Sequence, residues 1–246
     1  MTEHILKDDW LSYILKRDVY KVVLDDPFFK ELKNTTGTEY DVFQSLKNSY
    51  IFMFSRVSPQ KIDYTQCLEK EGFFLVDTNV AFEKYTSTHE DAEPNLCQLY
   101  FAESKDEEET VSLAKKAFSY SRFHLDPTFP RETANYVRGE WVRNYFNGQR
   151  GDELIVARMN ENVTGFLQLI YRSDGVLVID LIAVDEAYRR KGIAGAMIRF
   201  AEKSCGDFRT VRVGTQIANS PSLKLYESLG FRVTSADYIF HYHNRP

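Results

Sequence analysis

Cysteine is scarce in this chain, with Cys67, Cys97 and Cys205 as the only three among 246 residues. They are scattered, and they form neither a CxxC pair nor a metal-ligand spacing. Disulfide frameworks and cysteine-rich metal sites are therefore excluded. We expect three reduced thiols in a cytoplasmic protein.

Long apolar runs are also missing. No run approaches the roughly 18 residues of a membrane-spanning helix, and the charged start "MTEHILKDDW" has no apolar signal segment. The formal net charge is -5, whereas nucleic-acid-binding domains are usually basic. We expect neither a membrane nor a nucleic acid as partner.

Histidine is scarce too, and the five residues are spread along the chain. His241 and His243 alternate at strand spacing near the end. Two ligands on one face of a strand could hold a metal, but a half-exposed edge strand explains the same pattern. We therefore expect no metal.

The apolar content of 43% supports a core large enough for one large domain or two small ones. The polar stretch at 85–97 carries Pro94 and is the best linker candidate. We expect a smaller N-terminal α/β domain over 1–85, a linker over 86–95 and a main domain over 96–246.

The main domain alternates strand and helix patterns. Strands are predicted at 97–102, 153–159, 163–171, 175–184 and 209–217, with two more within 231–243. Helices are predicted at 106–120, 131–148, 189–205 and 220–231, with a loop at 121–130. The acidic run 106–109 fits a helix start, where the dipole favours negative charge. This order predicts a mixed α/β layer fold.

An internal echo links the two parts. "YESLGFRVTSADYIFHYH" (226–243) resembles "LEKEGFFLVDTNVAFEKY" (68–85) at a constant offset, and each reads as helix end, Gly-Phe, strand, turn, strand. At this offset Tyr226 aligns with Leu68. The N-terminal part is either a degenerate half-copy of the main domain or a chance likeness, and in both cases we expect a structural role.

The stretch "LIAVDEAYRRKGIAGAMI" (181–198) carries the first functional signal. An apolar strand ends at Val184, and after a short turn the basic stretch Arg189–Ala194, which contains Gly192, opens a helix. Free N–H groups and the dipole at a helix start favour an anion, and glycine lets a ligand approach the backbone. The pattern predicts a phosphate or pyrophosphate site. A tight turn with a solvated basic rim is the alternative.

The spacing R-x-x-G-x-A after an apolar strand resembles the acetyl-CoA pyrophosphate loop of the GCN5-related N-acetyltransferases (GNAT family). The resemblance implies the GNAT fold, a mixed sheet in which two central strands splay apart, with the pantetheine arm of acetyl-CoA in the gap. It assigns the cofactor to the following residues: Ile182, Ala183, Val184, Arg189, Arg190, Lys191, Gly192, Ile193, Ala194, Gly195 and Asn219.

The same resemblance makes Tyr226, in "NSPSLKLYESLGF" (219–231), the general acid that protonates the CoA sulfur. From the residues alone, Ser220 can cap this helix, and Tyr226 lies at the edge of its apolar stripe. A core-edge tyrosine is the alternative. Asp180, a lone acid in "VLVIDLIAV", is a candidate base for the acceptor amine or a strand-face residue that bonds its neighbours.

The stretches "SRFHLDPTFP" (121–130), "NYVRGEWVRNYF" (135–146) and 213–231 resemble a GNAT subfamily that acetylates nucleotide-linked 4-amino-4,6-dideoxy sugars. This implies acceptor contacts from Arg122, Phe123 and His124, with Arg122 on the diphosphate. Phe123 and Phe129 could equally anchor the loop in the core, and His124 could serve as a base or be solvated. A sugar amine with a lowered pKa needs no protein base.

We therefore expect a GNAT enzyme that transfers an acetyl group from acetyl-CoA to a nucleotide-linked amino sugar for surface-polysaccharide synthesis. The alternatives are a protein, aminoglycoside or polyamine acceptor, or a non-catalytic acyl-CoA-binding module. The family resemblance further suggests a homodimer.

Overall fold

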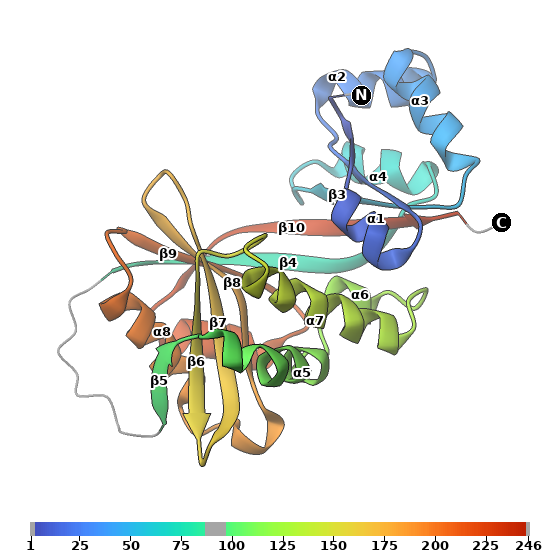
Figure 1. Cartoon of the computed structure of the whole chain (residues 1–246). Helices are drawn as coiled ribbons and strands as arrows, with labels where there is room; N and C mark the ends of the chain where they lie inside the picture. Colours follow the sequence, from blue (N-terminus) through green and yellow to red (C-terminus); the bar gives the residue numbers. More distant parts are fainter. Residues whose placement is uncertain (1–2, 87–96, 245–246) are drawn as a thin grey trace.

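The computed structural model describes residues 3–86 and 97–244. All strands join one ten-stranded mixed sheet in the order β1-β2-β3-β10-β4-β9-β8-β7-β6-β5 (Figure 1). The mixed α/β fold expected from the sequence is confirmed. Most of the predicted linker lies outside the described residues.

The N-terminal part contains four strands and four helices. In chain order they are β1 (Ile5–Lys7), α1 (Asp9–Leu15), β2 (Asp18–Val22), α2 (Asp26–Asn34), α3 (Thr38–Lys47), β3 (Ile51–Val57), α4 (Ile62–Lys70) and β4 (Phe74–Tyr85).

The C-terminal part follows the predicted order closely. Its elements are β5 (Gln98–Phe101), a 3-10 turn (Ser104–Asp106), α5 (Glu107–Ala117), α6 (Arg122–Leu125), α7 (Arg131–Phe146), β6 (Glu153–Met159), β7 (Asn162–Tyr171), β8 (Val176–Val184), a second 3-10 turn (Glu186–Tyr188), α8 (Ile193–Ser204), β9 (Thr210–Gln216), α9 (Ser220–Ser228) and β10 (Arg232–His243).

Two predicted details are wrong. The segment 231–243 forms one long strand, β10, because its polar middle continues to pair with β4 on one side while its end pairs with β3 on the other. The segment 121–130 contains the short helix α6 in place of a loop throughout.

The pairing directions of the strands are symmetric about the two long central strands, β4 and β10. β10 pairs antiparallel with β4, and each of them pairs antiparallel with a strand of the other part: β10 with β3, and β4 with β9. Outside these, β2 lies parallel to β3 as β8 lies parallel to β9. The sequence echo therefore corresponds to a pseudo-two-fold arrangement, and the sheet continues without a break from one part to the other (Figure 1).

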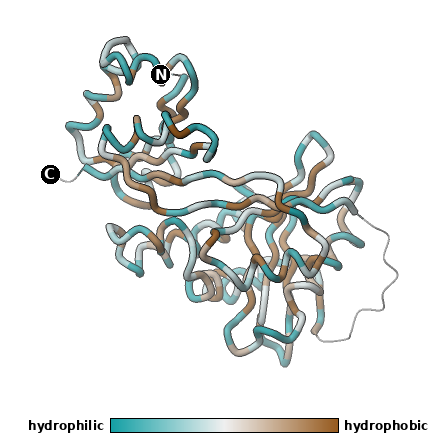
Figure 2. Tube along the Cα trace, turned by 180° about the vertical axis from the view of Figure 1, so that it is seen from behind, coloured by the Kyte–Doolittle hydropathy of each residue, from teal (hydrophilic) through white to brown (hydrophobic). Residues whose placement is uncertain are grey.

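Alternate residues of the outer strands face two different cores. On β6, Ile155 and Ala157 pack in a cluster with α8 and α9, whereas Leu154 and Val156 pack in a cluster with α5 and α7. Helices therefore cover both faces of this part of the sheet. Apolar residues concentrate along the strands (Figure 2). Among the described helices, none combines the length and apolar character needed to cross a membrane.

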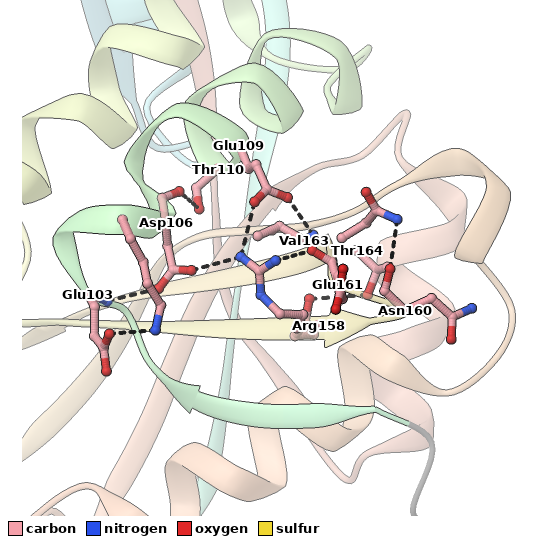
Figure 3. A network of polar contacts seen from close by, with 12 residues as sticks. Glu103, Asp106, Glu109, Thr110, Arg158, Asn160, Glu161, Val163 and Thr164 are labelled. Carbon is pink, nitrogen blue, oxygen red and sulfur yellow. Dashed lines mark hydrogen bonds and ion pairs between the residues drawn. The ribbon is translucent and has the colours of Figure 1, made fainter.

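The acidic run 106–109 lies at the start of α5, as predicted, and its side chains form hydrogen bonds and ion pairs with neighbouring elements. Asp106 accepts a hydrogen bond from the Glu103 N–H at 2.9 Å and pairs with Arg158 at 2.9 Å. Glu109 accepts from the Val163 N–H at 2.9 Å (Figure 3). These contacts fasten the start of α5 to the β6–β7 hairpin.

Candidate functional site

The site forms where β8 and β9 separate. The two strands pair in parallel only over Val176–Ile179 and Thr210–Val213. Beyond that point β8 continues to Val184 with β7 as its partner, so the backbone at 182–184 has no β9 ladder. The splayed pair predicted from the sequence is present.

Two cavities meet in this gap. The first, of about 480 Å³, is lined by the strand end at 182–184, the loop before α8 and the start of α9. The second, of about 230 Å³, lies toward β4, α6 and α7. Both are lined by Phe118, Ile182, Gln216, Asn219 and Ser222.

The start of α8 forms one wall of the first cavity. Gly192 is its N-cap in the left-handed region (φ 83°), and no side chain caps the helix. Arg190 is also left-handed (φ 62°). The first N–H groups of this three-turn helix are therefore directed to a ligand, and the dipole favours an anion there. Gly192, Ile193, Ala194 and Gly195 all line the cavity.

The basic residues of the loop have different surroundings. Arg189 lines the first cavity, but its guanidinium donates to the carbonyls of Val184 (3.1 Å) and Ala117 (3.0 Å), so it holds the loop in place. The Lys191 ammonium lies 4.8 Å from the Tyr188 ring centroid. Arg190 lines the cavity. Of the three cations, Arg189 and Arg190 therefore line the first cavity beside the backbone N–H groups of α8.

Asn219, and not Ser220, is the N-cap of α9. Its side-chain oxygen accepts from the Ser222 N–H (3.4 Å), and its amide donates to the Thr215 hydroxyl (3.2 Å). The cap lies one residue earlier than predicted because Ser220 is already helical. Asn219 still reaches both cavities.

Tyr226 belongs both to the core and to the second cavity. It is 2% exposed, and its ring lies 5.7 Å from those of Phe82 and Phe231. It also lines the second cavity. Burial raises the pKa of its hydroxyl well above the usual range, so the phenol stays protonated at neutral pH.

Arg122 and Arg138 make the second cavity cationic. Arg122 lies over the Phe54 ring (3.9 Å to the centroid), and the Nε of Arg138 is buried without a hydrogen-bond partner. Burial, with mutual repulsion, lowers the pKa of Arg122 to about 9, and burial lowers that of Arg138 to about 10. In the described chain neither guanidinium forms an ion pair with a carboxylate.

The other predicted acceptor residues differ in their surroundings. Phe123 is buried against Phe52 and Phe129 and also contributes to the wall of the second cavity. His124 hydrogen-bonds Ser121 (2.6 Å) and Asn135 (2.9 Å) and lines neither cavity. Both ring nitrogens of His124 therefore bond to residues of α6 and α7, and its role as a substrate contact or base has no support from the two cavities.

Asp180 lines the second cavity, but its carboxylate is occupied. Arg150 donates to both oxygens (2.6 and 2.7 Å), and Trp141 (3.0 Å) and Gln168 (3.3 Å) add two further bonds. These bonds match the alternative that the sequence left open for Asp180, a strand-face residue that bonds its neighbours.

Asp77 was missed by the sequence reasoning. It lies on β4, lines the second cavity and is 6% exposed, and neither oxygen has a hydrogen-bond partner in the described chain. Burial raises its pKa to about 6, with the nearby Gln216, Thr78 and Arg56 acting the other way. The available signal was an acid inside the apolar run "GFFLVDTNVAF", but only the β4–β9 pairing brings it to the site.

His241 and His243 are not on an edge strand, because β10 is central. His241 Nδ1 and His243 Nε2 donate to one oxygen of Asp126 at 2.6 and 2.7 Å, and all three groups are buried. One potential metal-ligand atom from each of the three residues lies within 4.8 Å of the other two. The short contacts are those of hydrogen bonds, and they join β10 to the end of α6.

Comparison with known proteins agrees with this geometry. A sequence model of the acetyltransferase (GNAT) family matches residues 112–231. The spore coat polysaccharide biosynthesis protein SpsD of Bacillus subtilis (strain 168) is 30% identical over 236 residues, covering 94% of this chain and 80% of that protein.

Solved structures share the fold. A GCN5-related N-acetyltransferase from Sphaerobacter thermophilus matches with a TM-score of 0.63 at 16% identity, covering 93% of this chain and 74% of that one. A tandem GNAT protein from the clavulanic acid biosynthesis pathway matches with a TM-score of 0.57 at 12% identity, covering 85% and 68%. At such identities the likeness concerns the fold alone.

Proposed function

Because this chain belongs to the GNAT family of acetyltransferases, we propose that it acetylates the amine of a nucleotide-linked amino sugar, such as a dTDP-4-amino-4,6-dideoxyhexose. The acyl donor is acetyl-CoA, which supplies an activated thioester. The assignment of a nucleotide-linked amino sugar as the acceptor depends on the second cavity.

The first cavity fits the donor. The uncapped start of α8 and the left-handed Gly192 would hold the pyrophosphate, and the unpaired β8 edge at 182–184 would hold the amide groups of the arm. Asn219 lies where the two cavities meet. Tyr226, protonated and buried, is the proposed donor of a proton to the departing sulfur.

The observation that carries the acceptor proposal is that Arg122 and Arg138, both half-buried, line the second cavity without a salt bridge to a carboxylate in the described chain. Burying unpaired cations is costly, and a ligand that brings negative charge removes that cost. A sugar diphosphate supplies the charge and matches the planar guanidinium forks. A polyamine or aminoglycoside brings further positive charge to the same place.

The relative from Bacillus subtilis supports the same direction. SpsD is named as a spore coat polysaccharide biosynthesis protein, and activated sugars are the ordinary building blocks of polysaccharides. We infer a related role in surface-polysaccharide synthesis for this chain.

A direct assay tests the proposal. Protein, acetyl-CoA and a thiol reagent are mixed with dTDP- and UDP-linked 4-amino sugars, the free amino sugars, glucosamine, spermidine and peptides. We expect thiol release with the nucleotide-linked sugars, at a kcat/KM at least about 100-fold above that of the same sugar without its nucleotide, as expected for loss of charge-assisted contacts.

Arg138→Gln is the matched variant. It should lower kcat/KM for the nucleotide-linked sugar and leave that for the free amino sugar unchanged. Equal turnover of free and nucleotide-linked sugars, or faster turnover of peptides or spermidine, would refute the proposed acceptor.

A further inference from the structure

Asp77 is a buried carboxylate that forms no ion pair in the described chain, and the Thr78 N–H, the Gln216 side chain and the charge of Arg56 offset its burial only in part. Its two oxygens lack hydrogen-bond partners in the described chain, although the residue is 94% buried, at 6% exposure, in the wall of the second cavity. Buried charges are normally paired. An unpaired one in a cavity indicates that a ligand supplies the partner.

We propose that Asp77 is a catalytic residue of the acetyl transfer, and that its carboxylate binds the acceptor amine and removes a proton from it. The residue comes from β4, in the N-terminal part of the chain. The inference rests on the proposed function only in assigning the second cavity to the acceptor.

The surrounding charges leave Asp77 available for an amine. Arg56, on β3, is paired with Asp237 of β10 at 3.7 Å. Asp180, on β8, is bound by Arg150. Arg122 and Arg138 line the same cavity without joining Asp77 in an ion pair. An ammonium carries three donors and no acceptor, which suits a carboxylate without an ion-pair partner.

The proton balance of this step is simple. The acceptor ammonium gives one proton to Asp77, and the freed electron pair on nitrogen forms the C–N bond to the acetyl carbon as the C–S bond breaks. The departing sulfur takes the Tyr226 hydroxyl proton. Asp77 and the new amide nitrogen each release a proton to solvent, and the phenolate regains one, so one proton leaves overall.

The surroundings of Asp77 also make its ability to accept a proton depend on pH. Burial raises the pKa of Asp77 to about 6, and the neighbouring Thr78 N–H, Gln216 and the Arg56 charge oppose this rise. Asp77 is therefore ionised and able to accept a proton above about pH 6, and protonated below it. Tyr226, which lines the same cavity, stays protonated throughout this range because burial raises its pKa.

Asp77→Asn tests the inference, with Glu83→Gln as control. Glu83 lies on the same strand but pairs with Arg212 outside the cavity. We expect Asp77→Asn to lower kcat by at least about 100-fold, in the range of general-base catalysis, and to remove the fall in kcat/KM on the acid side of about pH 6. Acetyl-CoA affinity should not change, and the melting temperature at pH 8 should not fall.

Measurements of sugar binding distinguish a failure of the Asp77 assignment from a failure of the proposed function. The wild type should bind a dTDP-linked 4-amino sugar at least tenfold more tightly than the matching 4-hydroxy sugar, and Asp77→Asn should bind the two alike. Equal affinity of the wild type for both sugars would overturn the Asp77 assignment. Failure of both to bind would overturn the nucleotide-sugar proposal instead.

In that second case the same comparison is made with the free amino sugars, glucosamine and spermidine. If Asp77→Asn acetylates every amine of the panel as well as the wild type does, with the same pH profile, Asp77 is not the base. A lower melting temperature with an unchanged pH profile would give it a structural role only.

Discussion

Val76 of β4 and Thr234 of β10 are the extra residues of two β-bulges in the β4–β10 pair. Each is skipped by the register that pairs its neighbours with the other strand. Val76 and Thr234 lie at equivalent positions of the two similar stretches, 68–85 and 226–243. Gly72 (φ 87°) and Gly230 (φ 85°) precede the two strands at equivalent positions. Bulges bend a strand and increase its twist, so the two halves of the sheet turn in the same way about the β4–β10 pair.

This arrangement makes β4 indispensable to the C-terminal part. β4 lies between β9 and β10, so a fragment beginning at residue 97 would leave both with an unpaired edge. We expect that fragment to aggregate or unfold, since exposed apolar edges associate and the buried Phe82 would be lost. Circular dichroism and gel filtration measure this. A monomeric fragment with a cooperative melt would contradict it.

Tyr226→Phe tests the proposed general acid. The ring keeps its packing against Phe82 and Phe231, so the fold and the acetyl-CoA affinity should persist while kcat falls about 100-fold or more. Tyr64→Phe, a buried tyrosine on α4, serves as the control and should retain activity. Near-normal turnover in the Tyr226 variant would return this residue to a purely structural role.

Gly192→Ala tests the anion site at α8. An alanine at φ 83° costs on the order of 1 kcal/mol and disturbs the N–H groups of the first turn. We expect the Kd for acetyl-CoA to rise about tenfold, with little change for acetyl-pantetheine, which lacks the pyrophosphate. Gly206→Ala is the control, because a Cβ there meets nothing within 4 Å. An equal loss for both donors would argue against a pyrophosphate contact.

The buried pair of histidines predicts acid sensitivity. Burial lowers the pKa of His241 to about 4, although Asp126 acts to raise it. From about pH 6.5 down to about 4 the unfolded chain therefore binds a proton that the folded chain does not. The free energy of unfolding should fall with pH by up to about 1.4 kcal/mol per unit.

Asp126 adds to this effect at lower pH. The hydrogen bonds from His241 and His243 hold the pKa of Asp126 below its usual range, so its contribution is present at neutral pH and is lost as the pH falls further. Urea unfolding at several pH values measures both. Asp126→Asn should cost about 3 kcal/mol at pH 7, whereas the exposed Asp41→Asn should change stability by less than about 0.5 kcal/mol. A His241→Asn chain that keeps the full pH slope would contradict this account.

Much of the local structure could be predicted because it depends on neighbours in the chain. The acidic first turn of α5 and the Gly-Phe steps before β4 and β10 follow from backbone geometry and capping within a few residues. The helix predicted from residue 189 begins at Ile193, because Arg190 and Gly192 are left-handed. The cap of α9 was displaced by one residue for the same local reason, since Asn219 and Ser220 are both good caps.

The chemistry of the carboxylates could not be predicted in this way. Arg150, thirty positions away, binds Asp180, and nothing in "VLVIDLIAV" indicates that partner. Asp77 and Arg138 gained roles because strand pairing and helix packing bring them to one cavity without bringing them together. Their pKa values depend on burial and on distant charges, which no local pattern contains.

The sequence by itself determined the glycine-containing turn before α8, the order of the elements and the echo between the two parts, because these depend on dihedral preferences and apolar periodicity. Only the tertiary structure decided that β4 inserts between β9 and β10, that the two histidines are buried on Asp126, and that Asp77 of β4 lines the second cavity. The reason is physical: contacts between residues far apart in the chain are selected by the packing of the whole sheet.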